Sequence, residues 1–157
     1  MMKCTGYYWS VVLLSWLLIG CGGAQKEEVV PEPTEESMTA TINGSNWKAQ
    51  VVDMLLLDND FLLSGQELDA NGFPTRVIVI QGPFTRPGTY GIGAVNGNEV
   101  GYIEEAESAD ISRGALVITR ITDRWVEGTF NFEGSIGRGA NNRRIVVTNG
   151  RFAAKKR

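Results

Sequence analysis

The sequence predicts an all-β protein: an antiparallel β-sandwich of about eight or nine short strands, with a closed β-barrel as the alternative. Two observations lead to this fold class. From Met38 onward, short apolar runs alternate with glycine, asparagine and proline, which is typical of strands joined by turns. In addition, no stretch of about 11 or more residues carries the apolar stripe of an amphipathic helix.

Individual strands follow from the period of the apolar residues. In Val126–Phe132, the residues Val126, Phe130 and Phe132 fall on one face and polar residues on the other, which predicts one buried and one solvated face. The runs Arg76–Gln81 and Ile145–Val147 are apolar on both faces, so we expect them to be central strands. The predicted strands are Thr39–Ile42, Trp47–Leu57, Phe61–Leu68, Arg76–Gln81, Thr89–Ile92, Val100–Glu105, Ala115–Ile121, Val126–Phe132 and Ile145–Thr148.

Hairpin turns are predicted where asparagine and glycine occur together, because both residues tolerate positive φ. Such turns fall at Asn43-Gly44, at Asn71-Gly72 and at Asn96-Gly97-Asn98. Pro83 and Pro87 bracket a further loop.

Composition excludes several classes of function. The basic and acidic residues of 39–157 balance, so the domain lacks the basic face that nucleic acid requires, and we expect no nucleic-acid partner. The chain has no histidine, and both cysteines, Cys4 and Cys21, lie near its start. This excludes serine–histidine triads, cysteine–histidine dyads and ordinary zinc sites. We therefore expect no catalytic residues, no metal and no cofactor.

The first 20 residues have the layout of a signal peptide. Lys3 supplies a positive start, and the almost wholly apolar run Tyr7–Ile19 follows it. That run is shorter than the ~20 apolar residues that a membrane-spanning helix needs. The chain therefore divides into a signal peptide (1–20), a segment that begins at Cys21 and ends at residue 38, and a β-sandwich domain (39–157).

The junction Leu18-Ile19-Gly20-Cys21 resembles the lipobox of bacterial lipoproteins. The resemblance implies cleavage before Cys21, diacylation of its sulfur and acylation of its new amine, which provides the two or more acyl chains that stable anchoring requires. An ordinary signal peptide with a chance cysteine, or an uncleaved short anchor, is the alternative. Gly22, where aspartate would favour retention in the inner membrane, predicts the outer membrane.

Segment 22–38 predicts a flexible acidic linker, because it combines five glutamates and one lysine with few apolar residues. Its root-mean-square reach should be about 20–25 Å. Gln25-Lys26-Glu27-Glu28 also resembles a surface-export signal of one group of Gram-negative bacteria. With such a signal the domain faces the outside of the cell. If the stretch is only a solvated linker, the domain faces the periplasm.

The order of the motifs in the domain resembles that of a family of small single-domain bacterial lipoproteins without an assigned function. The resemblance covers about residues 38–152, implies the same fold and localisation, and carries over no active site. The motifs are Ile42-Asn43-Gly44 with Trp47, Gly88-Thr89-Tyr90, Leu116-Val117-Ile118-Thr119, Val126–Phe132 and Val146-Val147-Thr148-Asn149-Gly150-Arg151-Phe152.

Candidate binding residues each have a structural explanation. The aromatic residues are predicted to be core anchors, with ligand stacking as the alternative. They are Trp47, Tyr90, Tyr102, Phe130 and Phe132. Asp58-Asn59-Asp60 and Asp69-Ala70-Asn71-Gly72 resemble fragments of calcium loops but lack the full ligand pattern, so we expect turns. Gly91-Ile92-Gly93 has no helix after it that could support a phosphate site.

The densest acidic stretch comprises Glu99, Glu104, Glu105, Glu107 and Asp110. We expect a solvated or edge strand there, with Glu105 and Glu107 on one face. Paired carboxylates that hydrolyse glycosides are the alternative. Three arginines, Arg138, Arg143 and Arg144, flank a Gly-Ala-Asn-Asn tip and should keep that hairpin soluble.

These observations predict a non-enzymatic accessory lipoprotein, anchored in the outer membrane through Cys21. Its partner would be an envelope protein, a glycan or a small ligand. The alternatives are a carboxylate-dependent hydrolase of envelope or extracellular polysaccharide and a purely structural envelope component.

Overall fold

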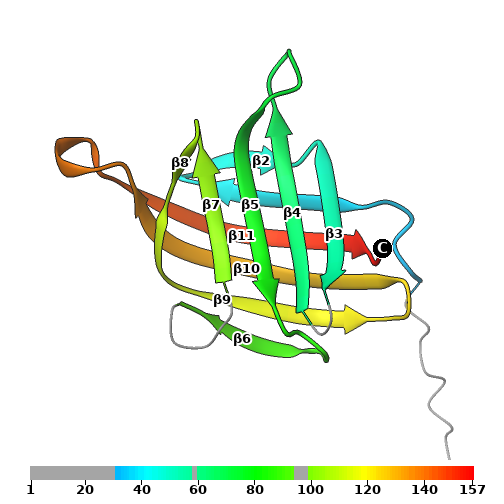
Figure 1. Cartoon of the computed structure of the whole chain (residues 1–157). Helices are drawn as coiled ribbons and strands as arrows, with labels where there is room; N and C mark the ends of the chain where they lie inside the picture. Colours follow the sequence, from blue (N-terminus) through cyan, green and yellow to red (C-terminus); the bar gives the residue numbers. More distant parts are fainter. Residues whose placement is uncertain (1–30, 58–59, 94–98) are drawn as a thin grey trace, which may run out of the picture. The chain divides into compact units, whose positions relative to one another are not determined.

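The computed structural model describes residues 31–57, 60–93 and 99–157, and residues from Ser37 onward form two packed antiparallel sheets (Figure 1). The six-stranded sheet has the order β2 (Ser45–Lys48), β1 (Ser37–Ile42), β11 (Arg143–Lys155), β10 (Trp125–Ile136), β9 (Asp110–Ile121) and β6 (Gly88–Ile92). The five-stranded sheet has the order β3 (Val51–Leu57), β4 (Asp60–Leu68), β5 (Pro74–Gly82), β7 (Glu99–Glu104) and β8 (Glu107–Ser108). The sheets stay separate, so the predicted sandwich is confirmed and the barrel is excluded.

The strands of one sheet run across those of the other, as in orthogonally packed sandwiches (Figure 1). Between β2 and β3 the chain passes from one sheet to the other at a single peptide bond. The N–H of Ala49 still donates to Met38 in β1, whereas the N–H of Gln50 donates to Gln66 in β4. The single strand predicted at Trp47–Leu57 is therefore wrong, because β2 and β3 lie in different sheets.

The core fills the space between the sheets and draws on both of them. Inward and outward residues alternate along most strands; β4, for example, buries Phe61, Leu63 and Gly65 in turn. Trp47 is 2 % exposed, and its ring lies against the backbone of Gly65 in the opposite sheet, where an added Cβ would lie 3.1 Å from the ring. The largest fully buried side chains are Tyr102, Phe132, Met38, Met54, Leu63, Ile78, Ile80, Leu116, Ile118, Ile136, Ile145 and Val126.

Several local predictions are confirmed. β5 is the middle strand of its sheet and β11 lies inside the other, as the doubly apolar runs indicated. The Asn43-Gly44 turn joins β1 to β2 with positive φ at both residues. Gly72 has a φ of 84° in the turn between β4 and β5. The turn predicted at 96–98 lies outside the described residues.

The acidic stretch differs from its prediction. Glu105 and Ala106 both have positive φ and form a two-residue turn that pairs Glu104 with Glu107. Glu105 and Glu107 therefore share no strand face, and Val100–Glu105 ends one residue earlier than predicted. Non-glycine residues with positive φ are uncommon, so this turn has no glycine or asparagine to mark it in the sequence. The expected edge position is confirmed, because β8 is the last strand of its sheet.

β11 is longer than the predicted strand Ile145–Thr148. It continues through Asn149, which has a φ of 53°, and the register shifts there against both β1 and β10. The Asn149-Gly150 pair therefore forms a bulge within a long strand instead of ending it.

The helical content of the described ranges is one 3₁₀ turn, Gly139–Asn141, at the tip of the β10–β11 hairpin. Within the same ranges, no helix is long and apolar enough to cross a membrane.

Candidate functional site

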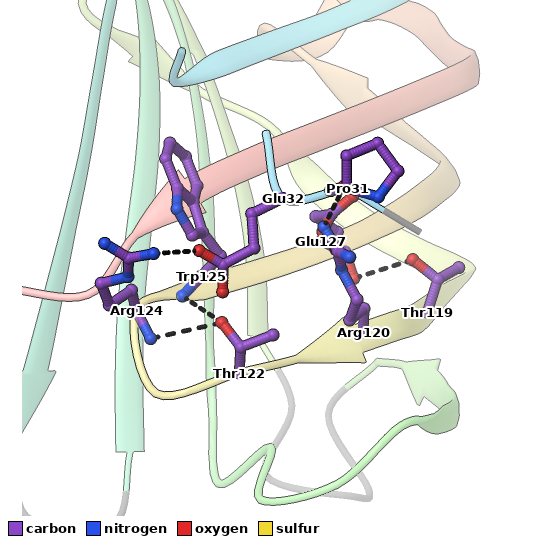
Figure 2. A network of polar contacts seen from close by, with 8 residues as sticks. All are labelled: Pro31, Glu32, Thr119, Arg120, Thr122, Arg124, Trp125 and Glu127. Carbon is purple, nitrogen blue, oxygen red and sulfur yellow. Dashed lines mark hydrogen bonds and ion pairs between the residues drawn. The ribbon is translucent and has the colours of Figure 1, made fainter. Parts of the chain in front are cut away.

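The segment that leads into the domain is attached to it by charged groups (Figure 2). The carboxylate of Glu32 forms an ion pair with Arg124, with 2.6 Å between Oε2 and Nη2. Arg120 donates from Nη2 to the carbonyl oxygen of Pro31 at 3.0 Å. Pro31 and Glu32, which fall within the predicted linker, therefore contact the end of β9 and the turn between β9 and β10.

Hydrogen bonds within the β9–β10 turn position the backbone of Arg124. The hydroxyl oxygen of Thr122 accepts hydrogen bonds from the backbone N–H groups of Arg124 and Trp125, at 3.3 and 3.0 Å (Figure 2). Trp125 is 7 % exposed and anchors the start of β10. The Thr122 hydroxyl and then Arg124 lower the pKa of Glu32 below its ordinary value. Glu32 therefore stays ionised, which maintains its attraction to Arg124.

A second attachment lies at the end of the chain. Glu36 accepts a hydrogen bond from the N–H of Lys155 at 3.1 Å and forms an ion pair with Arg157 at 2.6 Å. Arg157 also pairs with Asp53 of β3, at 2.6 Å. The two attachments join Pro31–Glu36 to both sheets, and we call this set of contacts the N-terminal clasp.

We expect the clasp to slow proteolysis within Pro31–Glu36. Arg124→Glu places like charges together and should speed cleavage after Glu35 by a glutamate-specific protease by about two- to fivefold, the size of effect expected from the loss of an exposed ion pair. The double variant Arg124→Glu, Glu32→Arg exchanges the two charges and should be cleaved at the wild-type rate. Arg113→Glu, which breaks an ion pair with Glu133 on the six-stranded sheet, is the matched control.

Acid should have the same effect as the Arg124 variant. Because the folded-state pKa of Glu32 is lowered, its contribution is present above the ordinary carboxyl pKa and is lost as pH falls through the lowered value. If wild type and Arg124→Glu were cleaved at the same rate, the clasp would not hold Pro31–Glu36 on the domain.

A family model for a domain of unknown function, DUF6252, matches residues 34–154. The chain belongs to this family. No curated protein and no solved structure shows a significant match. The match runs from just before β1 to the end of β11, so the DUF6252 domain is the sandwich, and Pro31 and Glu32 precede it.

The aromatic residues predicted as core anchors lie in the core of the DUF6252 domain. Trp47, Tyr102, Phe130 and Phe132 are each at most 2 % exposed. Tyr90 is half-buried; its ring lies edge-on to Phe84 at 4.8 Å and its hydroxyl donates to the carbonyl of Arg86. These positions confirm the packing role.

The predicted loops form turns where the structure describes them. One carboxylate oxygen of Asp69 accepts hydrogen bonds from the N–H groups of Asn71 and Phe73, at 2.8 and 2.9 Å. These bonds lower the pKa of Asp69, that from Phe73 having the largest effect. Cys21 and residues 58–59 lie outside the described residues. Gly91 and Ile92 lie in β6. Among the described residues, no group of three or more His, Cys, Asp or Glu side chains could hold a metal.

The charged residues around the β10–β11 tip divide into two groups. Arg144 pairs with Glu133 across the hairpin at 2.6 Å, and Arg143 reaches from β11 to Glu104 of β7. The second pair links the two sheets. Arg138 takes part in neither pair. Sequence reasoning missed this link and the clasp, because the net charge of the domain is balanced and only the fold decides which charges meet.

Tyr102 lies near the inter-sheet pair and makes a prediction about alkaline pH. It is fully buried, and its hydroxyl has no hydrogen-bond partner among the described residues. Burial, followed by the charge of Glu104, raises the pKa of Tyr102 to about 12. The contribution of neutral Tyr102 to the stability of the folded state is therefore complete below the unfolded-state pKa of about 10. It is lost as pH rises through the folded-state pKa.

Tyr102→Phe should remove this loss. Wild type should lose up to about 2–3 kcal/mol from this residue between pH 10 and 12, whereas the variant should be as stable as wild type at pH 7 or more so, since no hydrogen bond to a described residue is broken. Denaturant unfolding at several pH values measures the difference. A large destabilisation at pH 7 would show that the hydroxyl has a partner.

Proposed function

We propose that the protein is a lipoprotein of the outer membrane, held by acyl chains on Cys21, and that its DUF6252 domain is a non-enzymatic accessory or binding domain. The observation that carries the proposal is the Leu18-Ile19-Gly20-Cys21 junction behind an apolar segment that is too short to span a bilayer. Two or more acyl chains at this position would hold the protein stably.

The clasp bears on the length of chain that would separate the anchor from the domain. Pro31 is the first described residue, and the stretch from Cys21 to Pro31 reaches at most about 35 Å when fully extended. The predicted linker therefore contributes less free length than the whole of 22–38. The chain enters the domain beside the C-terminus, and the β10–β11 tip lies at the other end of the sandwich (Figure 1).

The carboxylates of the domain favour a non-enzymatic role. Glu67, Glu104 and Glu127 are the carboxylates of three ion pairs whose acidic side chains are 22–29 % exposed, and their partners are Arg76, Arg143 and Arg120. In each pair the arginine already occupies carboxylate oxygens, which are therefore less available to contact a substrate. The chain also has no histidine.

Replacement of Cys21 by serine tests the anchor. Intact mass of the membrane-extracted wild type should show loss of residues 1–20 and the addition of acyl chains. The Cys21→Ser protein should be released or left unprocessed. Cys4→Ser is the matched control, because it changes the other cysteine and should leave lipidation intact. Unchanged processing and membrane retention of Cys21→Ser would overturn the proposal.

Protease treatment of intact cells determines which side of the outer membrane the domain faces. If Lys26-Glu27-Glu28 acts as an export signal, the wild-type domain should be digested and a variant with three alanines there should be protected. If the domain faces the periplasm, both proteins should be protected until the outer membrane is opened. The two results separate an extracellular partner from a partner in the envelope.

A further inference from the structure

A polar cavity lies between two hairpins that belong to different sheets. One wall is the β7–β8 hairpin with the start of β9, and the other is the tip of the β10–β11 hairpin. Figure 1 shows both on the side of the sandwich opposite to the C-terminus. The cavity has a volume of about 600 Å³, is open to solvent, and is lined by Ala106, Glu107, Ser108, Asp110, Gly137, Arg138 and Asn141.

The inter-sheet ion pair holds these two walls together. Glu104 lies directly opposite Glu107 in the β7–β8 ladder, and Arg143 lies opposite Ile136, the residue before Gly137. The Glu104–Arg143 pair therefore joins the bases of both hairpins. The Glu104 side chain is 22 % exposed and that of Arg143 is 49 % exposed, so the pair is partly shielded from water on its acidic side only.

Gly137 allows the tip to adopt a conformation that other residues would strain. Its φ is +91°, and a Cβ there would lie 2.4 Å from the carbonyl oxygen of Asn141. Only glycine fits this position without strain. Arg138 and Asn141 follow Gly137 in this tip, and both are exposed.

The charges in the cavity are left without partners. No ion pair or side-chain hydrogen bond within the described part of the chain involves Glu107, Asp110 or Arg138. Seven of the ten described arginines pair with a carboxylate, whereas Arg138, Arg86 and Arg151 form no ion pair within the described residues. Of these three, only Arg138 lines the cavity. A cavity that keeps both signs of charge unpaired suits a ligand that carries both signs itself.

We propose that this cavity binds a short peptide with free ends. Its ammonium group would be held by Glu107 and Asp110, its terminal carboxylate by Arg138, and its amides by Ser108 and Asn141. A saccharide is a poorer match because no aromatic ring lines the cavity. The inference rests on the proposed function in that it gives the accessory domain its ligand, but binding needs no lipid, so the Cys21 experiment and the binding experiment can fail separately.

Trialanine tests the proposal when it is titrated into the full-length protein in detergent micelles. Calorimetry should show binding of trialanine with free ends, and about tenfold weaker binding after either N-acetylation or C-amidation, because each modification removes a charge-assisted hydrogen bond. A neutral disaccharide should not bind, and the peptide should be recovered uncleaved.

Variants assign the two ends of the peptide. In Arg138→Gln, free trialanine should bind about tenfold more weakly, and amidation should then make no further difference. Asp110→Asn should likewise reduce the effect of acetylation, and neutralising Glu107 as well should remove it. Arg151→Gln is the matched control, since Arg151 is an exposed arginine of β11 outside the cavity.

Four results would overturn the proposal. They are failure of free trialanine to bind, equal binding of the capped peptides, equal loss in Arg138→Gln and Arg151→Gln, and preferential binding of the disaccharide. Cleavage of the peptide would assign the cavity to a hydrolase and would contradict the non-enzymatic role as well.

Discussion

Gly150→Ala is expected to destabilise the sandwich by about 3 kcal/mol, although it adds only one methyl group. A Cβ at Gly150 would lie 2.4 Å from Cδ2 of the Phe130 ring and 2.5 Å from the Phe130 carbonyl oxygen. Phe130 is 2 % exposed, and its ring lies between those of Phe132 and Phe152, with centroids 6.3 and 6.5 Å away. The ring cannot move aside without disturbing the core, so the clash has to be relieved by the backbone.

Gly101→Ala is the control for this prediction. It introduces the same methyl group into a strand, but there the Cβ would lie an ordinary 3.7 Å from Val79. We expect its stability to remain within about 1 kcal/mol of wild type, because alanine also reduces the freedom of the unfolded chain. Equal stability of the two variants in urea would show that the bulge at Gly150 yields more easily than the structure implies.

Trp47→Ala is expected to cost about 3–5 kcal/mol, the range for truncation of a large buried aromatic residue. Trp47 is 2 % exposed and packs under Gly65 of the opposite sheet, so its loss opens a cavity between the sheets. The indole N–H has no hydrogen-bond partner among the described residues, so the loss comes from packing alone. Trp47→Phe should therefore retain much of the stability.

Phe73→Ala is the matched control, because Phe73 is 68 % exposed. Its removal should change stability by less than about 0.5 kcal/mol. Chemical denaturation of the three variants separates the two positions. If Trp47→Ala were as stable as Phe73→Ala, Trp47 would not be the core anchor that its burial indicates.

Local sequence patterns predicted much of the fold. Alternation along Val126–Phe132 identified the buried face of β10, and the Asn43-Gly44 pair identified its hairpin, because both features depend on residues close together in the chain. The break between β2 and β3 was missed. The buried positions change phase there, from Trp47 and Ala49 to Val52 and Met54, which is a local signal that a closer reading of the period could find.

The candidate sites could be predicted far less well. Arg138, Arg143 and Arg144 look alike in the sequence, yet Arg143 joins the two sheets, Arg144 pairs within its hairpin and Arg138 lines the cavity. The sequence pattern shows which face of a strand a charged residue occupies. Its ion-pair partner comes from another part of the chain, so the same pattern does not identify it.

The sequence by itself determined the strand content, several of the turns and the expectation of a lipid anchor at Cys21, since each of these is written in consecutive residues. Only the tertiary structure decided where the chain changes sheets, how Pro31–Glu36 lies on the domain and which two hairpins enclose the polar cavity. The physical reason is that burial and φ preferences act locally. Pairing between sheets depends instead on contacts such as Glu104 with Arg143, which are 39 residues apart and meet only when the sandwich has formed.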